Sequence, residues 1–319
     1  MEEMMFENRC REYKQYEDNW FNQNKTSCKC YKELKYARVY SLVDNIYNIH
    51  IPCTHNMGDV WLHLIVGDER ALLIDTGFGI GDLKSLVKKL CDDKELIVVN
   101  THCHGDHSLG NYQFDRVYIH KYDAPALMCQ MIPEYFYKFN HVGEVGIENH
   151  YYNDNDIISF KNYEIIPCDD GQTFDLGNGH QIVLIHMGGH CAGNSMLFDR
   201  KNKILFSGDA ILPFLNGAKG AKPEYASDAY FYKACSIRTY YQGLTTLMGH
   251  VENINSIFPA HGVLGLSPSV IKELFNATQS VVLNNVPCFD EERIMFNRLC
   301  RVKYLSNTLL YYYPPAVII

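Results

Sequence analysis

The strongest constraint on this chain is a run of metal-ligand side chains that directly follows an apolar segment. Residues 101–107 read Thr-His-Cys-His-Gly-Asp-His and come after the apolar residues 96–99. The run supplies four candidate ligands: His102, His104, Asp106 and His107. A strand that ends here would point the first two histidines to one side, because side chains alternate along a strand. The turn at the glycine would bring the other two toward a second point nearby. This donor set is typical of sites for zinc or another divalent transition metal.

Three further fragments carry candidate ligands where a strand gives way to a loop. His190 lies in the glycine-rich residues 188–194, Asp209 ends the sequence Leu-Phe-Ser-Gly-Asp, and His261 ends the sequence Phe-Pro-Ala-His. Functional side chains commonly lie on loops that a rigid scaffold holds in place. Any one of these fragments alone would be a weak signal. Seven other histidines, His50 and His63 among them, lack such a context and are interpreted as surface or core residues.

In this order the fragments resemble the five motifs of the metallo-β-lactamase superfamily. The match includes Asp75 in the sequence Leu-Ile-Asp-Thr-Gly and covers about residues 40–265. The departures are small: Met-Gly-Gly-His replaces the commoner Pro-Gly-His, and Cys191 stands where threonine is frequent. The resemblance implies an α/β fold, the four-layer αββα sandwich of that superfamily.

The same resemblance implies two divalent metal ions per chain, with zinc preferred over manganese or iron. It assigns His102, His104 and His190 to the first metal, Asp106, His107 and His261 to the second, and Asp209 to a bridge between them. Two cations about 3.5–4 Å apart can share one water and lower its pKa from 15.7 to about 7, which supplies a hydroxide nucleophile at neutral pH. Asp106 is also a candidate catalytic residue, because it could orient that hydroxide. Asp75 is expected to hydrogen-bond a ligand imidazole.

Tyrosines are abundant in this chain, with 23 residues. In similar hydrolases a tyrosine near the metals donates a hydrogen bond to the substrate carbonyl, which makes Tyr225, Tyr230 and Tyr240 candidates for this role. The spacing of the tyrosines in this region also suits helix packing, and packing is the favoured interpretation.

The pattern around the motifs divides the chain into three parts. Residues 1–35 are polar, with aromatic residues near helical spacing, and predict an N-terminal helical appendage. Residues 36–265 carry the motifs. Within them, the aromatic residues and Asn/Asp cluster of residues 131–155 predict a lid insertion. Residues 266–319 predict a helix and a hairpin that complete the same domain.

Local patterns also predict individual elements. Alternation predicts one strand over residues 43–51, and residues 227–248 predict one continuous helix. In the tail, residues 294–299 and 308–313 predict the two strands of the closing hairpin.

Composition and charge weigh against several functional classes. The net charge of −8 argues against a nucleic-acid surface, which would need clustered lysine and arginine. No apolar run approaches the ~18 residues of a membrane span. The acidic N-terminus lacks the apolar core of a signal peptide, which favours the cytoplasm. The twelve cysteines have no framework spacing and are expected to be reduced. Alternation predicts that Cys103 points away from the metal.

These expectations favour a metal-dependent hydrolase that cleaves a small ester, lactone or thioester. Lactones and carboxylic esters rank slightly ahead of a glyoxalase II-like thioesterase, which typically adds a helical C-terminal domain. The alternatives are a persulfide dioxygenase-like oxidoreductase, which uses one iron held by two histidines and an aspartate, and a phosphodiesterase, which the charge disfavours. The expected partner is a small-molecule substrate. The oligomeric state stays open, with a homodimer as one alternative.

Overall fold

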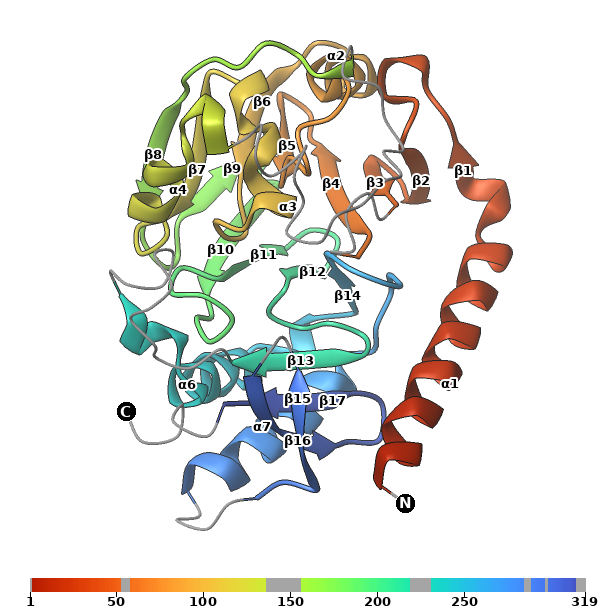
Figure 1. The fold of residues 1–319 in the computed structure, drawn as a ribbon. Coiled ribbons are helices and arrows are strands. Elements are labelled where there is room, and N and C mark those ends of the chain that lie inside the picture. Colours follow the sequence, from red (N-terminus) through yellow and green to blue (C-terminus); the bar gives the residue numbers. More distant parts are fainter. Residues whose placement is uncertain are drawn as a thin grey trace.

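Two β-sheets packed face to face form the centre of the molecule, and helices cover their outer faces (Figure 1). The computed structural model describes residues 2–52, 58–135, 156–218, 231–283, 288–295 and 298–313. Within these residues the helices are α1 (Glu2–Gln23), α2 (Leu83–Leu90), α3 (Gly105–Ser108), α4 (Ala124–Gln130), α6 (Ile237–Met248) and α7 (Ser269–Leu283). This arrangement confirms the αββα sandwich.

The first sheet follows the order of the chain. Its strands in the described residues are β1 (Cys28–Lys29), β2 (Arg38–Val43), β3 (Ile46–Ile51), β4 (Val60–Val66), β5 (Arg70–Ile74), β6 (Glu95–Val99), β7 (Arg116–His120) and β8 (Glu164–Cys168). The pairing is antiparallel from β1 to β5 and parallel from β5 to β8. The parallel half ends in loops at a single edge, because parallel strands share one direction.

The second sheet lies against the first. In sheet order its strands are β14 (Ser256–Pro259), β12 (Ile204–Gly208), β11 (Ser195–Asp199), β10 (Gln181–His186) and β9 (Thr173–Asp175). Side chains of both sheets fill the space between them, among them Trp61 and Leu72 from the first and Leu197 and Phe206 from the second. Strand β4 is apolar along nearly its whole length and largely buried, as expected for a strand covered on both faces.

Helix α2 covers the outer face of the first sheet. The carboxylate of Asp82 caps the helix by accepting a hydrogen bond from the amide of Ser85. The buried face follows helical spacing and consists of Leu83, Leu86, Val87 and Leu90.

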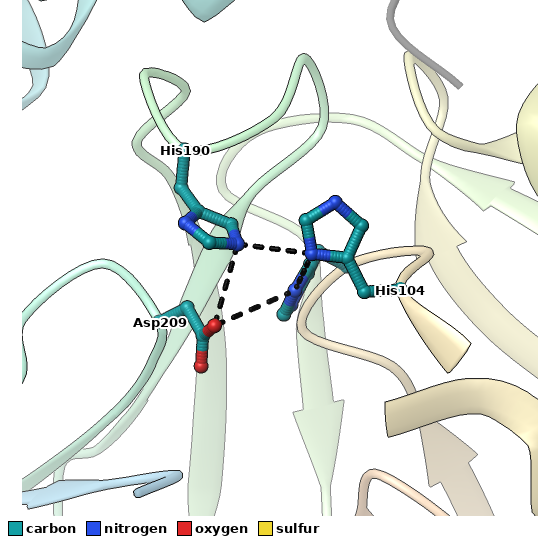
Figure 2. A group of neighbouring side chains, drawn as sticks. His104, His190 and Asp209 are labelled. Atoms are coloured by element: carbon teal, nitrogen blue, oxygen red, sulfur yellow. Dashed lines mark hydrogen bonds and ion pairs between the residues drawn. The ribbon is translucent and has the colours of Figure 1, made fainter. Parts of the chain in front are cut away.

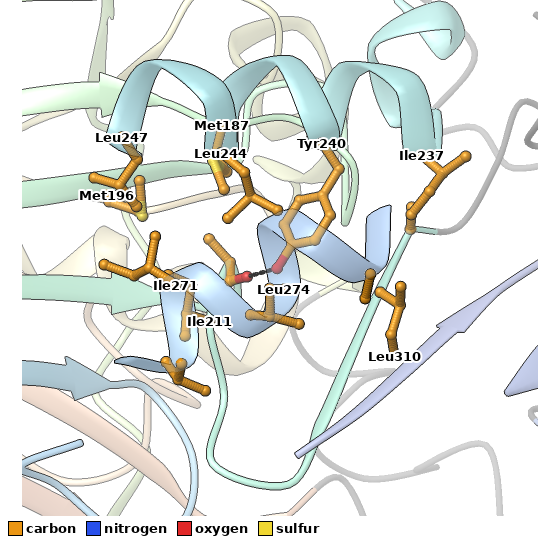
Figure 3. Packing of buried hydrophobic residues seen from close by; sticks show 14 of the residues in the cluster. Met187, Met196, Ile211, Ile237, Tyr240, Leu244, Leu247, Ile271, Leu274 and Leu310 are labelled. Atoms are coloured by element: carbon orange, nitrogen blue, oxygen red, sulfur yellow. Dashed lines mark hydrogen bonds between the residues drawn. The ribbon is translucent and has the colours of Figure 1, made fainter. Parts of the chain in front are cut away.

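Helices α6 and α7 cover the outer face of the second sheet. They share one apolar cluster, to which α6 contributes Tyr240, Leu244 and Leu247, and α7 contributes Ile271 and Leu274 (Figure 3). Helix α6 begins later than predicted, at Ile237, because Ser236 has extended backbone and caps the first turn. The predicted start at residue 227 is therefore wrong for residues 231–236, and residues 227–230 lie outside the described residues.

Residues 43–51 form the end of one strand and the whole of the next. Strand β2 ends at Val43 and β3 begins at Ile46, with a turn between them in which Asn45 has a φ of 61°. Asparagine tolerates this left-handed conformation better than most residues. The prediction of a single strand was wrong, because the alternation of apolar residues continues across the turn.

The tail forms a small third sheet instead of one hairpin. Its strands, in sheet order, are β13 (Leu215–Ala218), β17 (Leu309–Tyr312), β16 (Arg298–Tyr304) and β15 (Glu291–Met295). The predicted strand at residues 294–299 is wrong, because it spans the end of β15 and the start of β16. The predicted strand at residues 308–313 corresponds to β17, and the predicted C-terminal helix corresponds to α7.

The long helix α1 runs along one side of the molecule (Figure 1). The indole nitrogen of Trp20 donates to the carbonyl oxygen of Leu264 at 3.0 Å, and the guanidinium of Arg9 donates to that of Leu305 at 2.7 Å. Residues 28–29 then pair with β2 as strand β1. The N-terminal region is therefore helical as predicted, but it also extends the first sheet. No helix in the described part of the chain combines the length and hydropathy needed to cross a membrane.

A buried histidine on β4 makes stability depend on pH. The side chain of His63 lies between the sheets, with its Nδ1 2.9 Å from Oδ1 of Asn48 and its ring 4.9 Å from that of Phe206. Burial lowers the pKa of His63 to about 3, from an ordinary value of 6.5. The folded protein therefore keeps this imidazole neutral in the range where the unfolded chain protonates it.

We predict that His63 weakens the fold as the pH falls from 6.5 toward 3. The unfolded state takes up the proton first, so this residue lowers the unfolding free energy by up to about 1.4 kcal/mol per pH unit. Denaturant titrations in the presence of a chelator measure the unfolding free energy between pH 6.5 and 5. This free energy should fall less steeply with falling pH in His63→Leu than in the parent chain. The exposed His250, changed to leucine, is the control. Equal slopes in all three proteins would contradict the prediction.

Candidate metal centre

Five segments deliver the seven predicted ligands to one region of the sandwich. His102 and His104 follow β6, and Asp106 and His107 lie on the short helix α3. His190 lies in the loop between β10 and β11, Asp209 directly follows β12, and His261 follows β14. The candidate ligands thus lie just beyond the ends of buried strands, on loops or on the short helix α3, where the scaffold holds their backbone in place.

The first group of ligand atoms contains three imidazoles and one carboxylate. Nδ1 of His104 lies 3.0 Å from Nε2 of His102 and 3.0 Å from Nε2 of His190. Nε2 of His190 is in turn 3.3 Å from Oδ2 of Asp209 (Figure 2). The four ligand atoms all lie within 4.8 Å of one another. They point toward a common centre, as the ligands of one metal ion do.

The second group contains Asp106, His107 and His261. Oδ2 of Asp106 lies 3.4 Å from Nε2 of His107 and 3.4 Å from Nε2 of His261. The three ligand atoms also lie within 4.8 Å of one another. The structure therefore brings together the residues that the resemblance assigned to a second metal.

Asp209 lies between the two groups. Its Oδ2 faces His190 of the first group, whereas its Oδ1 lies 3.4 Å from Nε2 of His107 and 3.2 Å from Nε2 of His261 in the second. One carboxylate thus presents an oxygen to each set of imidazoles. This is the position that a carboxylate bridging two cations would occupy.

The buried atoms of this region fit a metal site. Among the described residues, Nε2 of His107 and Oδ1 of Asp209 are buried and accept or donate no hydrogen bond. An unsatisfied buried polar atom costs about 1–3 kcal/mol. Imidazole nitrogen and carboxylate oxygen are also the ligands that zinc and similar metals take. A cation at each group would satisfy these atoms.

Charge within the cluster has a consequence for metal binding. Burial acts to lower the pKa of His107, but the carboxylates of Asp106 and Asp209 outweigh burial and raise that pKa to about 10. Burial likewise opposes a charged His261, and Asp209 and Asp106 raise its pKa well above the usual value. For His102, burial and the neighbouring histidines hold the pKa well below 6.5. A metal at the second group would therefore displace protons, as binding to histidine commonly does.

Asp75 orients one of the candidate ligands, as the sequence predicted. Its Oδ2 lies 2.9 Å from Nδ1 of His107, and its Oδ1 accepts a hydrogen bond of 2.7 Å from the amide of Thr101. The contact with Nδ1 leaves Nε2 of His107 to face the second group. The carboxylate of Asp75, just after β5, therefore contacts the first and the last residue of the run 101–107.

Sequence reasoning missed Asp59, which supports His261. The backbone oxygen of Asp59 is a hydrogen-bond partner of Nδ1 of His261, and its side-chain Oδ1 accepts from the amide of Gly262 at 3.2 Å. Its Oδ2 lies 2.9 Å from Nε2 of His50. His50 was interpreted as a surface or core residue without a role, and the structure places it beside this support. No local motif marks the contact, since about 200 residues separate its partners.

Asp123 supports the first group and was also missed. Its Oδ2 accepts from the amide of Cys103 and from the thiol of Cys191, both at 3.0 Å, and its Oδ1 accepts from the amide of Gly193 at 2.6 Å. Asp123 thereby joins the loop of His102 and His104 to the loop of His190. The sulfur of Cys103 lies in a separate buried group with the sulfur of Cys191 and the carboxylate of Asp123. This confirms that Cys103 points away from the centre.

Of the three candidate tyrosines, only Tyr240 lies within the described residues. It is fully buried, and its hydroxyl donates to the carbonyl oxygen of Ala210 at 2.6 Å (Figure 3). Tyr240 therefore has the packing position that was the favoured interpretation. Tyr225 and Tyr230 lie outside the described residues, as do residues 136–155 of the lid insertion, and their roles stay predictions.

Comparison with curated proteins shows a group of related thioesterases. The chain is 31% identical over 180 residues to the acyl-coenzyme A thioesterase MBLAC2 of Homo sapiens, a match that covers 49% of this chain and 59% of that protein. The acyl-coenzyme A thioesterase MBLAC2 of Gallus gallus is 27% identical over 177 residues, which cover 49% of this chain and 58% of the relative. The chain thus matches little more than half the length of these relatives.

Solved structures share the fold at low sequence identity. A β-lactamase domain protein from Burkholderia ambifaria superposes with a TM-score of 0.53 at 15% identity, over 77% of each chain. A metallo-β-lactamase family protein from Thermus thermophilus gives a TM-score of 0.51 at 17% identity, over 76% of this chain and 82% of that one. Residues 56–243, more than half of the sequence, match the family described as the metallo-beta-lactamase superfamily. The chain therefore belongs to the metallo-β-lactamase superfamily.

Proposed function

We propose that this protein is a metal-dependent hydrolase of acyl thioesters, with acyl-coenzyme A esters as its substrate class. The observation that carries the proposal is the position of Asp209, whose two carboxylate oxygens face two separate groups of metal ligands. The similarity to acyl-coenzyme A thioesterases supports the choice of substrate. The proposal places thioesters ahead of the lactones and carboxylic esters that the sequence alone favoured.

The proposed centre holds two divalent ions, with zinc as the first choice. His102, His104 and His190 would hold one ion, Asp106, His107 and His261 the other, and Asp209 would contact both. When bound, such a pair supplies Lewis acidity for the thioester carbonyl and makes a water acidic enough to attack at about neutral pH.

The protein's own residues orient the reacting groups. Burial acts to raise the pKa of Asp106, but His107 and His261 outweigh it and hold the pKa well below its usual range, so the carboxylate stays ionised. An ionised Asp106 can accept a hydrogen bond from the attacking water and fix its direction toward the carbonyl carbon. The hydrogen-bond partners of His107 and His261 keep each Nε2 turned toward the centre. Attack on the carbonyl carbon then breaks the carbon–sulfur bond, so that the acyl group leaves as a carboxylic acid and the sulfur takes a proton from the attacking water and leaves as the thiol.

The second ligand group argues against the main alternative. A persulfide dioxygenase-like centre uses one iron with two histidines and an aspartate, so it has no need of a second set of ligands. Here the ligand atoms of Asp106, His107 and His261 also lie within 4.8 Å of one another. A nucleic-acid phosphodiesterase stays the less favoured alternative, because the net charge of −8 argues against the basic surface that a nucleic acid requires.

A substrate panel on protein of measured metal content tests the proposal directly. We expect an acyl-coenzyme A ester and a short acyl thioester to be hydrolysed faster than lactones, phosphodiesters or β-lactams. Thiol release measures the first two reactions. Faster hydrolysis of lactones would show that lactones are the substrate class instead. Oxygen consumption by protein that holds one iron per chain would show that the reaction is an oxidation and not a hydrolysis.

We predict that Asp209→Ala loses metal and most of its turnover while the fold is retained. Removing a residue that supports a ligand costs about 10–100-fold in metal affinity or activity, and removing the shared carboxylate should cost more. Elemental analysis and thioester kinetics measure the two losses, and circular dichroism checks the fold. Asp199→Ala is the control, because this buried aspartate binds His180 and lies outside both ligand groups. Full activity in Asp209→Ala would refute the central role of this carboxylate.

We further predict that Asp59→Ala weakens metal binding at the second group by about 10–100-fold. The variant loses the carboxylate that holds the amide of Gly262, so His261 would no longer be held in one orientation. Competition with a chelator of known affinity measures the change, and excess metal should restore most of the kcat. The exposed Asp18, changed to alanine, serves as the control. Unchanged metal affinity would show that the backbone of Asp59 alone suffices.

A further inference from the structure

We propose that Tyr122 and Phe231 form a stacking platform for the adenine ring of a coenzyme A thioester. This inference rests on the proposed function and adds a binding site for the nucleotide end of the substrate. The two rings are stacked, with centroids 4.5 Å apart and planes inclined by 26°. Along the chain, Tyr122 lies between β7 and α4, and Phe231 directly precedes the 3-10 turn η5 (Tyr232–Cys235), which leads into helix α6.

The platform is accessible although it is made of aromatic residues. Phe231 is 39% exposed, so Tyr122 covers only part of its ring. Beneath them the rings of His120 and His186 are stacked at 4.0 Å, and both meet Tyr122 edge to face, at 4.8 and 5.4 Å. Tyr122 is thus held in place from one side. A rigid aromatic pair with an exposed face is a surface on which a flat base can stack.

Hydrogen bonds connect the platform to the metal-ligand loops. Tyr122 directly precedes Asp123, which binds the loops of His102 and His190. On the other side of the platform, the amide of Ala234 donates to the carbonyl oxygen of Phe231. The carbonyl oxygen of Ala234 in turn accepts from the amide of Gly189, which is next to His190. Both platform residues therefore lie one short connection away from the proposed reaction centre.

Lys121 lies beside the platform and Lys233 is exposed two residues after Phe231, so both are candidates to contact the phosphates of a nucleotide. The amino group of Lys121 lies 5.7 Å from the centre of the Tyr122 ring, and Lys233 is exposed on η5. Lys121 also pairs with Asp169 at 2.5 Å, on the exposed surface, where such pairs contribute little and can exchange. Ammonium groups beside a stacked adenine are suited to contact the phosphates of the same nucleotide.

The chemistry of the platform fits coenzyme A better than a shorter thioester. Coenzyme A joins an adenine nucleotide to its thiol through a long flexible arm, so one molecule can place its base on the platform and its thioester at the metal ligands. A short thioester lacks the base and would use the centre alone. Loss of the platform should therefore affect only the long substrate.

The first test is binding of the nucleotide end alone, with 3′-phosphoadenosine 5′-diphosphate as the probe and metal-free protein. We expect Phe231→Leu to weaken binding about tenfold, as the loss of a stacked aromatic does. Phe231→Trp should retain or strengthen binding. Tyr16→Ala, an exposed aromatic residue on α1, is the matched control. Absence of binding to the parent protein, or equal binding by Phe231→Leu, would overturn the platform.

The second test compares two thioesters with the same acyl group, one of coenzyme A and one of N-acetylcysteamine. Phe231→Leu should raise the KM for the coenzyme A ester about tenfold, with kcat unchanged, and leave kcat/KM for the short ester unchanged. Equal effects on both esters would overturn the platform and leave the proposed function intact. Failure of the parent protein to hydrolyse either ester would instead overturn the proposed function.

Discussion

The candidate metal centre depends on the placement of one carboxylate, Asp209, among largely buried imidazoles. Burial alone would make a charged Asp209 unfavourable, but His261, His107 and His190 surround it and hold its pKa well below the usual range. The attraction acts in a largely buried region, where each charge interacts more strongly with its neighbours than in water. The loops that carry these side chains are therefore drawn to one place, and their remaining unsatisfied atoms favour a cation. The sandwich supplies the rigid strand ends from which they extend.

Three further aspartates restrict how those loops can move. Asp75 holds the run of residues 101–107, Asp59 holds the turn after β14, and Asp123 joins the loops of the first ligand group. Each carboxylate accepts hydrogen bonds from backbone amides and leaves the ligand imidazoles free to face the centre. This arrangement separates the residues that would contact metal from those that position them. It also explains why Cys103 and Cys191, although next to ligands, belong to the supporting layer.

The candidate ligands could be located in the sequence, whereas the residues that support them could not. His102, His104, Asp106 and His107 lie within six positions, and the other candidate ligands lie in recognisable fragments where a strand gives way to a loop. Asp59 and Asp123 act across about 200 and 70 positions on residues with which they share no motif, so only the folded chain reveals them. The same limit applies to the fold: alternation predicted strands near residues 43–51, but the turn at Asn45 and the helix start at Ser236 depend on local backbone geometry.

Helix α6 connects the supporting layer to the proposed nucleotide platform. The hydroxyl of Tyr240 on this helix donates to the carbonyl oxygen of Ala210, next to Asp209. Tyr240 also packs closely on Gly189: a β-carbon at position 189 would lie 2.8 Å from the β-carbon of Tyr240. Gly189 also has a φ of 78°, which favours glycine. The residues just before the same helix carry Phe231. A single packed helix thus sets the positions of Asp209, of the His190 loop and of the platform relative to one another. Catalytic centre and substrate selection would then be coupled through packing, because a change that moved α6 would move all three.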